Sequence, residues 1–348
     1  MSSPTLLKVE SESLLPAIPT QDDRQLLIAS RKYAEEYRWK SWLHLISTLV
    51  TLAVLVAIAG LSSPIWLRSL SSLLIGLTLV RMFILYHDYL HQAIFKGSRT
   101  AGAILTIYGH LMLTAPTVWK RSHDHHHRNN SKLLGASIGS FPIMTTSGYQ
   151  SASLLQRIEY RVSRSPLTIL FGYFTVFLFG MCLFPLFCDF KRNTGVFITL
   201  LLHFGLIAFS VIFFGWATTA FVFLIPTALA MMLGSYLFYI QHNFPAAKIR
   251  TNTEWSYTDA ALCSSSYLEL GTIMRWFTGN IGYHHIHHLN AKIPFYRLPE
   301  AMAGLKGLQN PGRTSLKISE IISCLSLKLW DTDRDQLVPF WSGQQVKS

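Results

Sequence analysis

Five long apolar runs constrain the fold of this chain most strongly. They cover approximately residues 42–61, 66–86, 166–187, 195–215 and 217–240. Each run approaches or exceeds the ~20 residues that an α-helix needs to cross the hydrocarbon core of a bilayer. The chain has 348 residues, of which 50% are hydrophobic and 14% are charged. This pattern predicts an all-α integral membrane bundle. The first 25 residues are polar and partly acidic, so we expect no cleavable signal peptide.

Three histidine clusters, at residues 87–91, 123–127 and 284–288, have the spacing of metal ligands on helices. Positions i, i+3 and i+4 of an α-helix share one face. The histidines that share a face in this way are His87 and His91, then His123, His126 and His127, and finally His284, His287 and His288. Eight imidazoles are too many for one ordinary metal site and suit two ions. His125 and His285 point away from these faces, and we interpret the isolated His44 and His203 as polar residues with structural partners.

The cysteines exclude two other kinds of site. Cys182, Cys188, Cys263 and Cys324 lie far apart and form no C-x-x-C pair, which argues against a thiolate zinc site and against a disulfide framework. The expected ligands are therefore nitrogen atoms, with oxygen as a possible addition. Such a set suits iron, copper or zinc.

The net charge of +12 does not indicate a nucleic-acid partner. The basic residues are spread through the segments that flank the apolar runs, and no nucleic-acid-binding motif accompanies them. Their placement fits the positive-inside rule and the attraction of cations to anionic lipid headgroups.

Charge placement also predicts a topology. We expect residues 1–41 to form a cytoplasmic segment, 42–241 a membrane domain, and 242–348 a cytoplasmic cap that completes the metal site. The four spans are 42–61, 66–86, 195–215 and 217–240, and the segments 101–115 and 166–187 are shallow. The second shallow segment should dip in and return, with a break near Gly180 and Pro185. Both termini and all three clusters then lie on the cytoplasmic side.

The clusters, taken together and in this order, resemble the histidine boxes of membrane fatty-acid desaturases, H-x-x-x-H, H-x-x-H-H and a late H-x-x-H-H. The runs NIGYHHIHHL at 280–289, YIQHNF at 239–244 and IPFYRL at 293–298 resemble the acyl-lipid branch of that family, as does LWD at 329–331. The resemblance covers roughly residues 40 to 340. The three boxes are specific for the superfamily, although not for one reaction.

The resemblance implies a non-haem di-iron centre that uses dioxygen and two external electrons to introduce a double bond into an acyl chain of a lipid. It also implies that His242 is an additional ligand, although a capping or interfacial histidine is the alternative. Asp88 and Asp124 either orient imidazoles or are simply exposed to solvent. Asn280 either holds a metal-bound water, if the last helix extends back that far, or caps that helix. His125 could replace His126 if the helix is distorted.

The electron donor is expected to be a separate protein, because the sequence contains no haem-binding His-Pro-Gly-Gly and no G-x-G-x-x-G motif. A ferredoxin or a small cytochrome that docks on the cytoplasmic face fits this role. The nearest alternative is a lipid or carotenoid hydroxylase or ketolase on the same scaffold, against which the segments around Gln241 and Trp330 argue. A membrane metal transporter or a haem-binding subunit is disfavoured, because only His203 lies in the middle of an expected span.

Overall fold

The computed structural model describes residues 21–61, 64–133 and 140–341. Within them the chain is mainly helical, as predicted, and five strands of two or three residues lie outside the long helices. The α-helices are α1 Gln21–Ser30, α2 Arg38–Gly60, α3 Ile65–Leu90, α4 Arg99–Leu111, α5 Pro116–Asn129, α6 Thr146–Ser151, α7 Leu154–Ser163, α8 Pro166–Leu170, α9 Phe184–Cys188, α10 Gly195–Thr219, α11 Ile225–Ile240, α12 Tyr257–Cys263, α13 Thr272–Phe277, α14 His284–Leu289, α15 Leu298–Gly304 and α16 Ile318–Ser326. The strands are β1 Met144–Thr145, β2 Tyr267–Glu269, β3 Arg313–Ser315, β4 Leu329–Asp331 and β5 Gln336–Val338.

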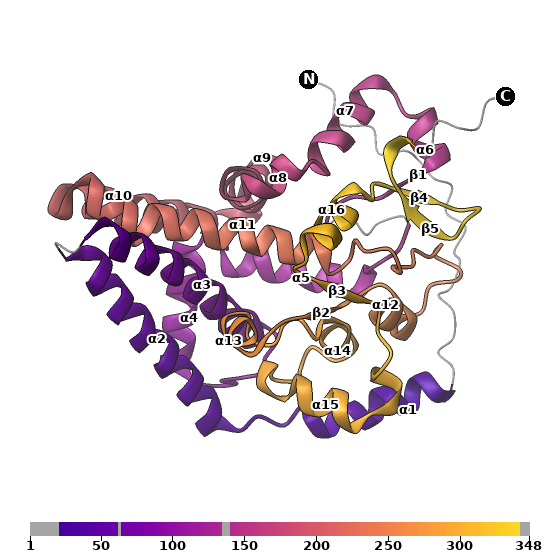
Figure 1. Ribbon diagram of the computed structural model, residues 1–348, viewed down its shortest axis with the longest axis horizontal. Coiled ribbons are helices and arrows are strands. Elements are labelled where there is room, and N and C mark those ends of the chain that lie inside the picture. Colours follow the sequence, from indigo (N-terminus) through magenta and orange to yellow (C-terminus); the bar gives the residue numbers. More distant parts are fainter. Residues whose placement is uncertain (1–20, 62–63, 134–139, 342–348) are drawn as a thin grey trace.

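Helices α2 and α3 form an antiparallel hairpin (Figure 1). Both are long and apolar enough to cross a membrane. Helix α2 exposes apolar side chains such as Val50 and Val54 along its length, whereas most of α3 is buried in the protein. Because apolar side chains are stable against lipid, α2 has the surface of a peripheral helix and α3 that of a central one.

The apolar stretch Gly195–Ile240 also qualifies by length and hydropathy, and it folds back on itself. As one straight helix it would be about 70 Å long, more than twice the ~30 Å of a hydrocarbon core. The chain turns at Gly215, whose φ of 77° and ψ of 166° are not helical. Ser210 Oγ lies 2.8 Å from Thr219 Oγ1, although nine residues of straight helix would separate them by about 13 Å. The part of α10 before Gly215 and the chain from Trp216 through α11 are therefore the two arms of a second hairpin, as the sequence predicted.

The tips of the two hairpins meet at the same end of the molecule, at the left of Figure 1. Arg68, near the start of α3, donates from Nε to the Ala59 carbonyl at 2.9 Å. Its guanidinium also lies 4.6 Å from the ring centre of Phe221, which follows α10, a distance typical of a cation–π contact. The end of each hairpin that lies away from its tip is therefore directed towards the rest of the protein.

The two segments predicted to be shallow are helical but short. Helix α4 is followed by α5 at an angle of 88°, and Pro116 begins the second helix. The segment after α8 is π-helical over Tyr173–Leu183 and continues into α9. The predicted break near Gly180 and Pro185 is therefore wrong, because the helix tolerates both residues through its wider π turns. The apolar helix Tyr173–Cys188 is about 24 Å long and still shorter than a hydrocarbon core.

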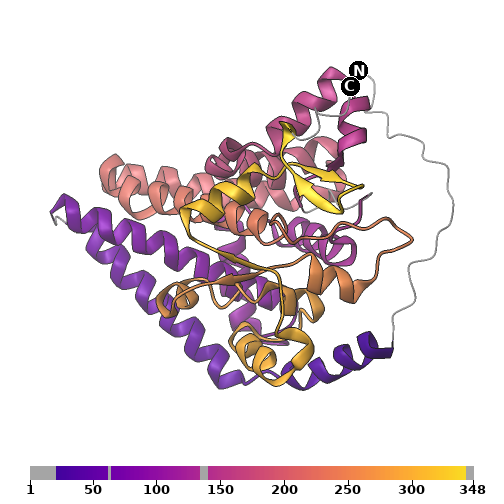
Figure 2. The same cartoon turned by 45° about the vertical axis from the view of Figure 1, so that its right-hand side comes forward.

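Residues after α11 form a cap of short elements against the ends of α3, α5 and α11, and this packing is visible in both views (Figures 1 and 2). Strand β2 pairs in parallel with β3, with Tyr267 opposite Arg313. Strand β4 pairs in parallel with β1 and antiparallel with β5. Strands this short leave no periodic pattern in a sequence, so the all-helical prediction did not include them.

Candidate metal centre

Three helices and one loop bring nine histidines to the buried junction of the membrane helices and the cap. The last turn of α3 carries His87, and His91 is its C-terminal cap residue. Helix α5 carries the second cluster and α14 the third. His242 follows two residues after α11. The side chains form two groups, of which the first contains His87, His91, His123, His127 and His287 and the second contains His126, His242, His284 and His288.

In each group the ring nitrogens converge on a common point. Within the first group, His123 Nε2 lies 2.9 Å from His87 Nε2 and 3.1 Å from His127 Nε2. His287 Nε2 lies 3.1 Å from His127 Nε2. All candidate ligand atoms of a group lie within 4.8 Å of one another. This is the arrangement of donors around one ion.

The second group has the same geometry. His242 Nε2 lies 3.0 Å from His126 Nε2 and 3.0 Å from His284 Nε2. His288 Nε2 lies 3.1 Å from His284 Nε2. Helices α5 and α14 contribute to both groups, so the two sites are adjacent.

These separations fit metal coordination better than hydrogen bonding. A neutral imidazole has one N–H and one lone pair, so a ring of Nε2 atoms cannot all be paired with each other as donors and acceptors. Two nitrogens at right angles around an ion, each about 2.1 Å from it, are about 3.0 Å apart. In addition, His91 Nε2 is buried without a hydrogen-bond partner in the described part of the chain, which an ion in the first group would remedy.

Two imidazoles are oriented by contacts of Nδ1, the ring nitrogen that does not face the other histidines of its group. His87 Nδ1 lies 3.0 Å from Asp88 Oδ1, and Asp88 Oδ2 accepts a hydrogen bond of 2.7 Å from the Phe295 N–H. His242 Nδ1 donates to the Ser264 carbonyl at 2.9 Å. Contacts of this kind place the proton on Nδ1 and leave the Nε2 lone pair for a metal.

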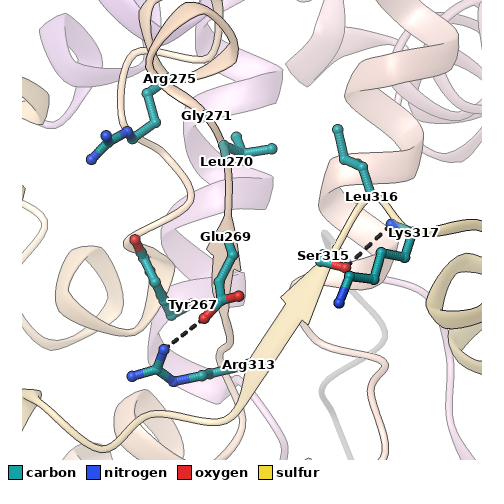
Figure 3. Close-up of a pocket in the computed structure, with 9 residues that line it drawn as sticks. All are labelled: Tyr267, Glu269, Leu270, Gly271, Arg275, Arg313, Ser315, Leu316 and Lys317. Carbon is teal, nitrogen blue, oxygen red and sulfur yellow. Dashed lines mark hydrogen bonds and ion pairs between the residues drawn. The ribbon is translucent and has the colours of Figure 1, made fainter.

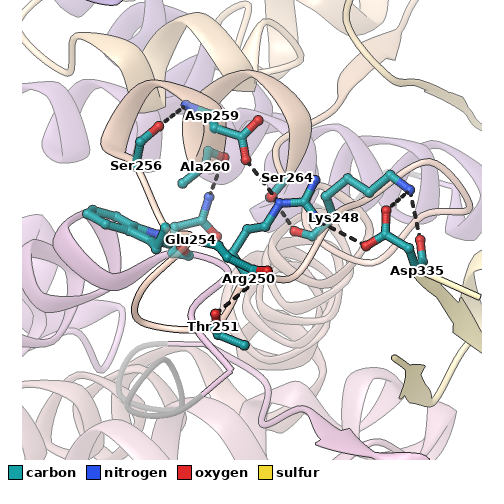
Figure 4. Close-up of polar contacts among 11 residues, drawn as sticks. Lys248, Arg250, Thr251, Glu254, Ser256, Asp259, Ala260, Ser264 and Asp335 are labelled. Atoms are coloured by element: carbon teal, nitrogen blue, oxygen red, sulfur yellow. Dashed lines mark hydrogen bonds and ion pairs between the residues drawn. The ribbon is translucent and has the colours of Figure 1, made fainter. Parts of the chain in front are cut away.

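A polar network holds the loop that presents Ser264 (Figure 4). The hydroxyl of Ser264 donates to the Lys248 carbonyl, and Lys248 Nζ donates to Asp335 Oδ2 at 2.6 Å. Arg250 pairs with the same carboxylate at 2.9 Å and with Asp259 at 3.4 Å. The orientation of His242 thus depends on contacts with Asp335, in the turn between β4 and β5.

Burial favours the uncharged form of the histidines in the second group. Desolvation lowers the pKa of His126, His284 and His288 well below its ordinary value, and neighbouring imidazoles lower it further. The pKa of His242 falls to about 4 for the first of these reasons. Neutral imidazole is the form that binds metal ions, so the second group is ready for metal at neutral pH.

The remaining candidates from the sequence have other contacts. His125 is half-buried and belongs to neither group, so it does not replace His126. His285 is buried on the opposite face of α14 and donates to the Leu308 carbonyl at 3.0 Å. Asp124 forms an ion pair of 2.6 Å with Lys120, in agreement with the solvent-facing alternative. The isolated histidines have structural partners as expected, since His44 binds Arg81 and His203 binds Tyr173 and the Leu111 carbonyl.

Asn280 does not lie on the helix of the third cluster. Helix α14 begins at His284, and Asn280 has a φ of 54° in the preceding turn. Its Nδ2 donates to the Phe295 carbonyl at 3.2 Å. The helix therefore does not extend back to Asn280, which was the condition for a metal-bound water there, because a left-handed residue interrupts helical geometry.

Comparison with known proteins identifies the family. A model of the family described as fatty acid desaturase matches residues 63–315. The chain belongs to the fatty acid desaturase family. Among its desaturase relatives is a fatty acid desaturase of Bacillus subtilis (strain 168), 33% identical over 300 residues that cover 85% of this chain and 79% of the relative. Another is the chloroplastic omega-6 fatty acid desaturase of Spinacia oleracea, 22% identical over 247 residues, or 70% of this chain and 54% of the relative.

Family membership agrees with the histidine boxes and with the apolar helices. This desaturase is an oxidoreductase that acts on acyl chains, and its histidine groups can bind metal. The names of both relatives favour desaturation over the hydroxylase, ketolase and transporter alternatives.

Sequence reasoning placed Trp119 close to the histidine clusters but missed most of the other groups that surround the imidazoles. The indole of Trp119, one turn before His123, stacks on that ring with centroids 4.3 Å apart. Phe238 lies 5.0 Å from the ring of His126. The i, i+4 spacing placed Trp119 beside its histidine, but the contacts of Phe238 and of the Ser264 carbonyl arise from tertiary packing.

Proposed function

We propose that the nine histidines hold two iron ions and that the protein introduces a double bond into an acyl chain of a membrane lipid. The observation that carries the proposal is the convergence of their ring nitrogens in two adjacent buried groups. His87, His91, His123, His127 and His287 serve the first ion, and His126, His242, His284 and His288 serve the second. Imidazole-rich sites suit iron among the transition metals, and family membership supports iron over zinc and copper.

The metal and dioxygen supply oxidising power that side chains lack, so that two hydrogens leave adjacent methylene carbons. The reaction balances as one CH₂–CH₂ unit, one O₂, two electrons and two protons giving one CH=CH unit and two waters. The protein's own part is to position and to protect. Asp88 and the Ser264 carbonyl keep the protons of His87 and His242 on Nδ1, while Trp119 and Phe238 cover the rings and exclude water.

The two electrons come from a separate protein, for which a ferredoxin or a small cytochrome is the proposed donor. Electrons must reach a centre that lies between the helix ends and the cap. The cap is therefore the face on which we expect the donor to dock, and the protein's net positive charge favours an acidic partner.

We also propose four spans, with the metal centre and both termini in the cytoplasm. The meeting of both hairpin tips at one end supports this topology, because α3 and α11 then end on the same side as their histidines. Basic residues such as Lys191 and Lys292, on segments assigned to the cytoplasm, fit the positive-inside rule.

The test is metal content together with lipid analysis. The purified wild-type chain should contain about two irons, and lipids of a host that expresses it should gain one double bond, localised by gas chromatography with mass spectrometry. His242→Ala should reduce iron towards one per chain and lower desaturation at least about 100-fold, because one of the four ligands of the second group is lost. His125→Ala is the matched control from the same histidine-rich region and should change neither quantity. A chain with one zinc and no iron, or lipids that gain a hydroxyl without an alkene, would contradict the proposal.

A further inference from the structure

His242 is the ligand of the second group that lies outside a helix. Helix α11 ends at Ile240, and His242 lies in the turn that follows, with its N–H bonded to the Tyr239 carbonyl at 3.2 Å. The other three ligands of this group lie within α5 and α14. The Ser264 carbonyl orients the ring of His242, but the backbone of a turn is less constrained than that of a helix. The position of this ligand therefore depends on what holds the turn.

A buried arginine binds the turn on both sides of His242. Arg164 is the C-terminal cap residue of α7, and only 1% of it is exposed. Its Nη2 donates to Asn243 Oδ1, directly after the ligand in sequence. The same nitrogen lies 3.2 Å from the hydroxyl of Tyr239, in the last turn of α11, and 3.2 Å from the Leu327 carbonyl. One guanidinium thus joins the end of α11, the turn and the segment before β4.

The side chain of Asn243 is fixed at both ends of its amide. The oxygen accepts from Arg164, while Nδ2 donates to the Cys324 carbonyl at 2.6 Å and to the Leu327 carbonyl at 3.1 Å. An amide whose oxygen and nitrogen are both bonded has one preferred orientation. Asn243 is therefore held between the cap residue of α7 and the chain that follows α16.

A second buried cation holds the backbone of Arg164. Lys328 Nζ donates to the Arg164 carbonyl and lies 3.3 Å from the Tyr239 hydroxyl. The acceptors of both cations in this cluster are neutral oxygen atoms. Burial, together with the charge of Arg164, lowers the pKa of Lys328 to about 8. Buried cations without an opposite charge are destabilising, so stability alone does not account for this pair.

A guanidinium suits the geometry of these contacts. Its planar fork presents several N–H donors in fixed directions. Nη1 of Arg164 donates to the Pro142 carbonyl at 2.8 Å, while Nη2 contacts the turn. The arginine is thus anchored on one side of the fork and holds Asn243 with the other.

We propose that Arg164 is a positioning residue for the second metal group. By holding Asn243 and Tyr239 it fixes the turn that places His242 Nε2 beside the ring nitrogens of His126 and His284. Arg164 acts through the neighbours of His242 and not on its ring. The inference rests on the proposed function, because it assumes that the second group holds an ion.

Backbone amide hydrogen exchange tests the link without metal. In metal-depleted full-length protein in detergent, Arg164→Gln should speed exchange of residues 240–244 about tenfold, because the turn opens more readily without its anchor. Asn243→Ala should act in the same direction. The double variant should exchange no faster than the faster single variant, because both substitutions break one link. Effects that multiply in the double variant would show that the two residues act independently and would overturn the proposal.

Iron retention tests the consequence for the site. During competition with a chelator, Arg164→Gln should release one of the two ions about tenfold more readily and leave the other as in the wild type. In a His242→Ala background, which retains the ion of the first group, Arg164→Gln should weaken iron binding no further. Equal weakening of both ions, or a further loss in that background, would indicate general destabilisation of the fold and contradict a positioning role.

Arg313→Gln is the matched control, since it removes a guanidinium elsewhere in the cap. Figure 3 shows Arg313 at the edge of a cavity of about 570 Å³, paired with Glu269 at 2.6 Å. Its side chain is about half exposed, so the variant should change neither the exchange of residues 240–244 nor iron retention. Effects as large as those of Arg164→Gln would overturn the assignment.

Two features keep the outcomes separate. If Arg164→Gln does not accumulate as folded protein, Asn243→Ala tests the same link and leaves the buried cation in place. Because exchange is measured without metal, a wild-type chain that never binds iron would contradict the proposed function alone. Unchanged exchange in Asn243→Ala would contradict the role of Arg164 alone.

Discussion

At the scale of single residues, Asp88 links the first metal group to the cap. One carboxylate oxygen orients His87 and the other accepts the backbone N–H of Phe295. The carboxylate is almost fully buried, so both oxygens need these donors. A residue next to a ligand thus controls the ligand's tautomer and also holds a loop that is far away in sequence.

Asp88→Asn should weaken metal binding without removing a ligand. The amide retains the shape of the carboxylate but can accept at only one atom, so either His87 or Phe295 loses its partner. We expect apparent iron affinity to fall about 10- to 100-fold, as is usual when an outer hydrogen-bond partner of a ligand is changed. Competition with a chelator measures this. Asp124→Asn is the matched control, since Asp124 pairs with Lys120, and a loss of affinity as large as that of Asp88→Asn would refute the role of Asp88.

At the scale of elements, the chain reversal at Gly215, near the end of α10, depends on one backbone conformation. The φ and ψ of Gly215 lie in a region that is essentially restricted to glycine. A Cβ there would meet no atom within 4 Å, so any cost of a side chain comes from the backbone alone. The hairpin, and with it the direction in which α11 delivers His242, is therefore sensitive to this residue.

Gly215→Ala should destabilise the protein by about 1–3 kcal/mol, the usual cost of a strained backbone conformation. Gly205→Ala in α10 is the control, because a Cβ there also meets no atom within 4 Å and its backbone is helical. It should be neutral or slightly stabilising, since alanine favours helix over glycine. Thermal unfolding in detergent separates the two, and equal melting temperatures would show that Gly215 is not strained.

At the scale of the whole molecule, hairpin tips and histidines occupy opposite ends. The tip contact between Arg68 and Phe221 and the converging histidines define these ends. A membrane enclosing the hairpins therefore leaves all ligands on one side. The proposed direction of the hairpins relative to the cytoplasm rests on the distribution of cations.

Single cysteines in a cysteine-free background test this topology. Lys191→Cys and Lys292→Cys should react with an impermeant maleimide only when the cytoplasmic face is accessible, as in inverted vesicles. Trp216→Cys, at the tip of the second hairpin, should react only from the other side. All three side chains are exposed in the structure. Whether the reagent reaches them therefore depends on the side of the membrane on which they lie. Labelling of positions 191 and 292 from opposite faces would overturn the four-span topology.

The sequence by itself determined which histidines of each cluster share a helix face and which apolar runs are long enough to form the two helical hairpins. Both follow from local geometry, because a period of 3.6 residues places His284, His287 and His288 on one face and His285 on the other. Apolar runs of membrane length are equally local signals. Family resemblance added His242, for which no spacing rule exists.

Only the tertiary structure decided how the histidines divide between the two groups. His126 and His127 are neighbours on α5 yet belong to different groups. Successive residues of an α-helix differ by about 100° around its axis, so the two side chains point in different directions. Which side meets which partner depends on how α3, α5 and α14 dock, and that docking depends on packing between residues far apart in the sequence. The same is true of the contacts of the Ser264 carbonyl and of Asn280, because each joins segments whose proximity no local pattern records.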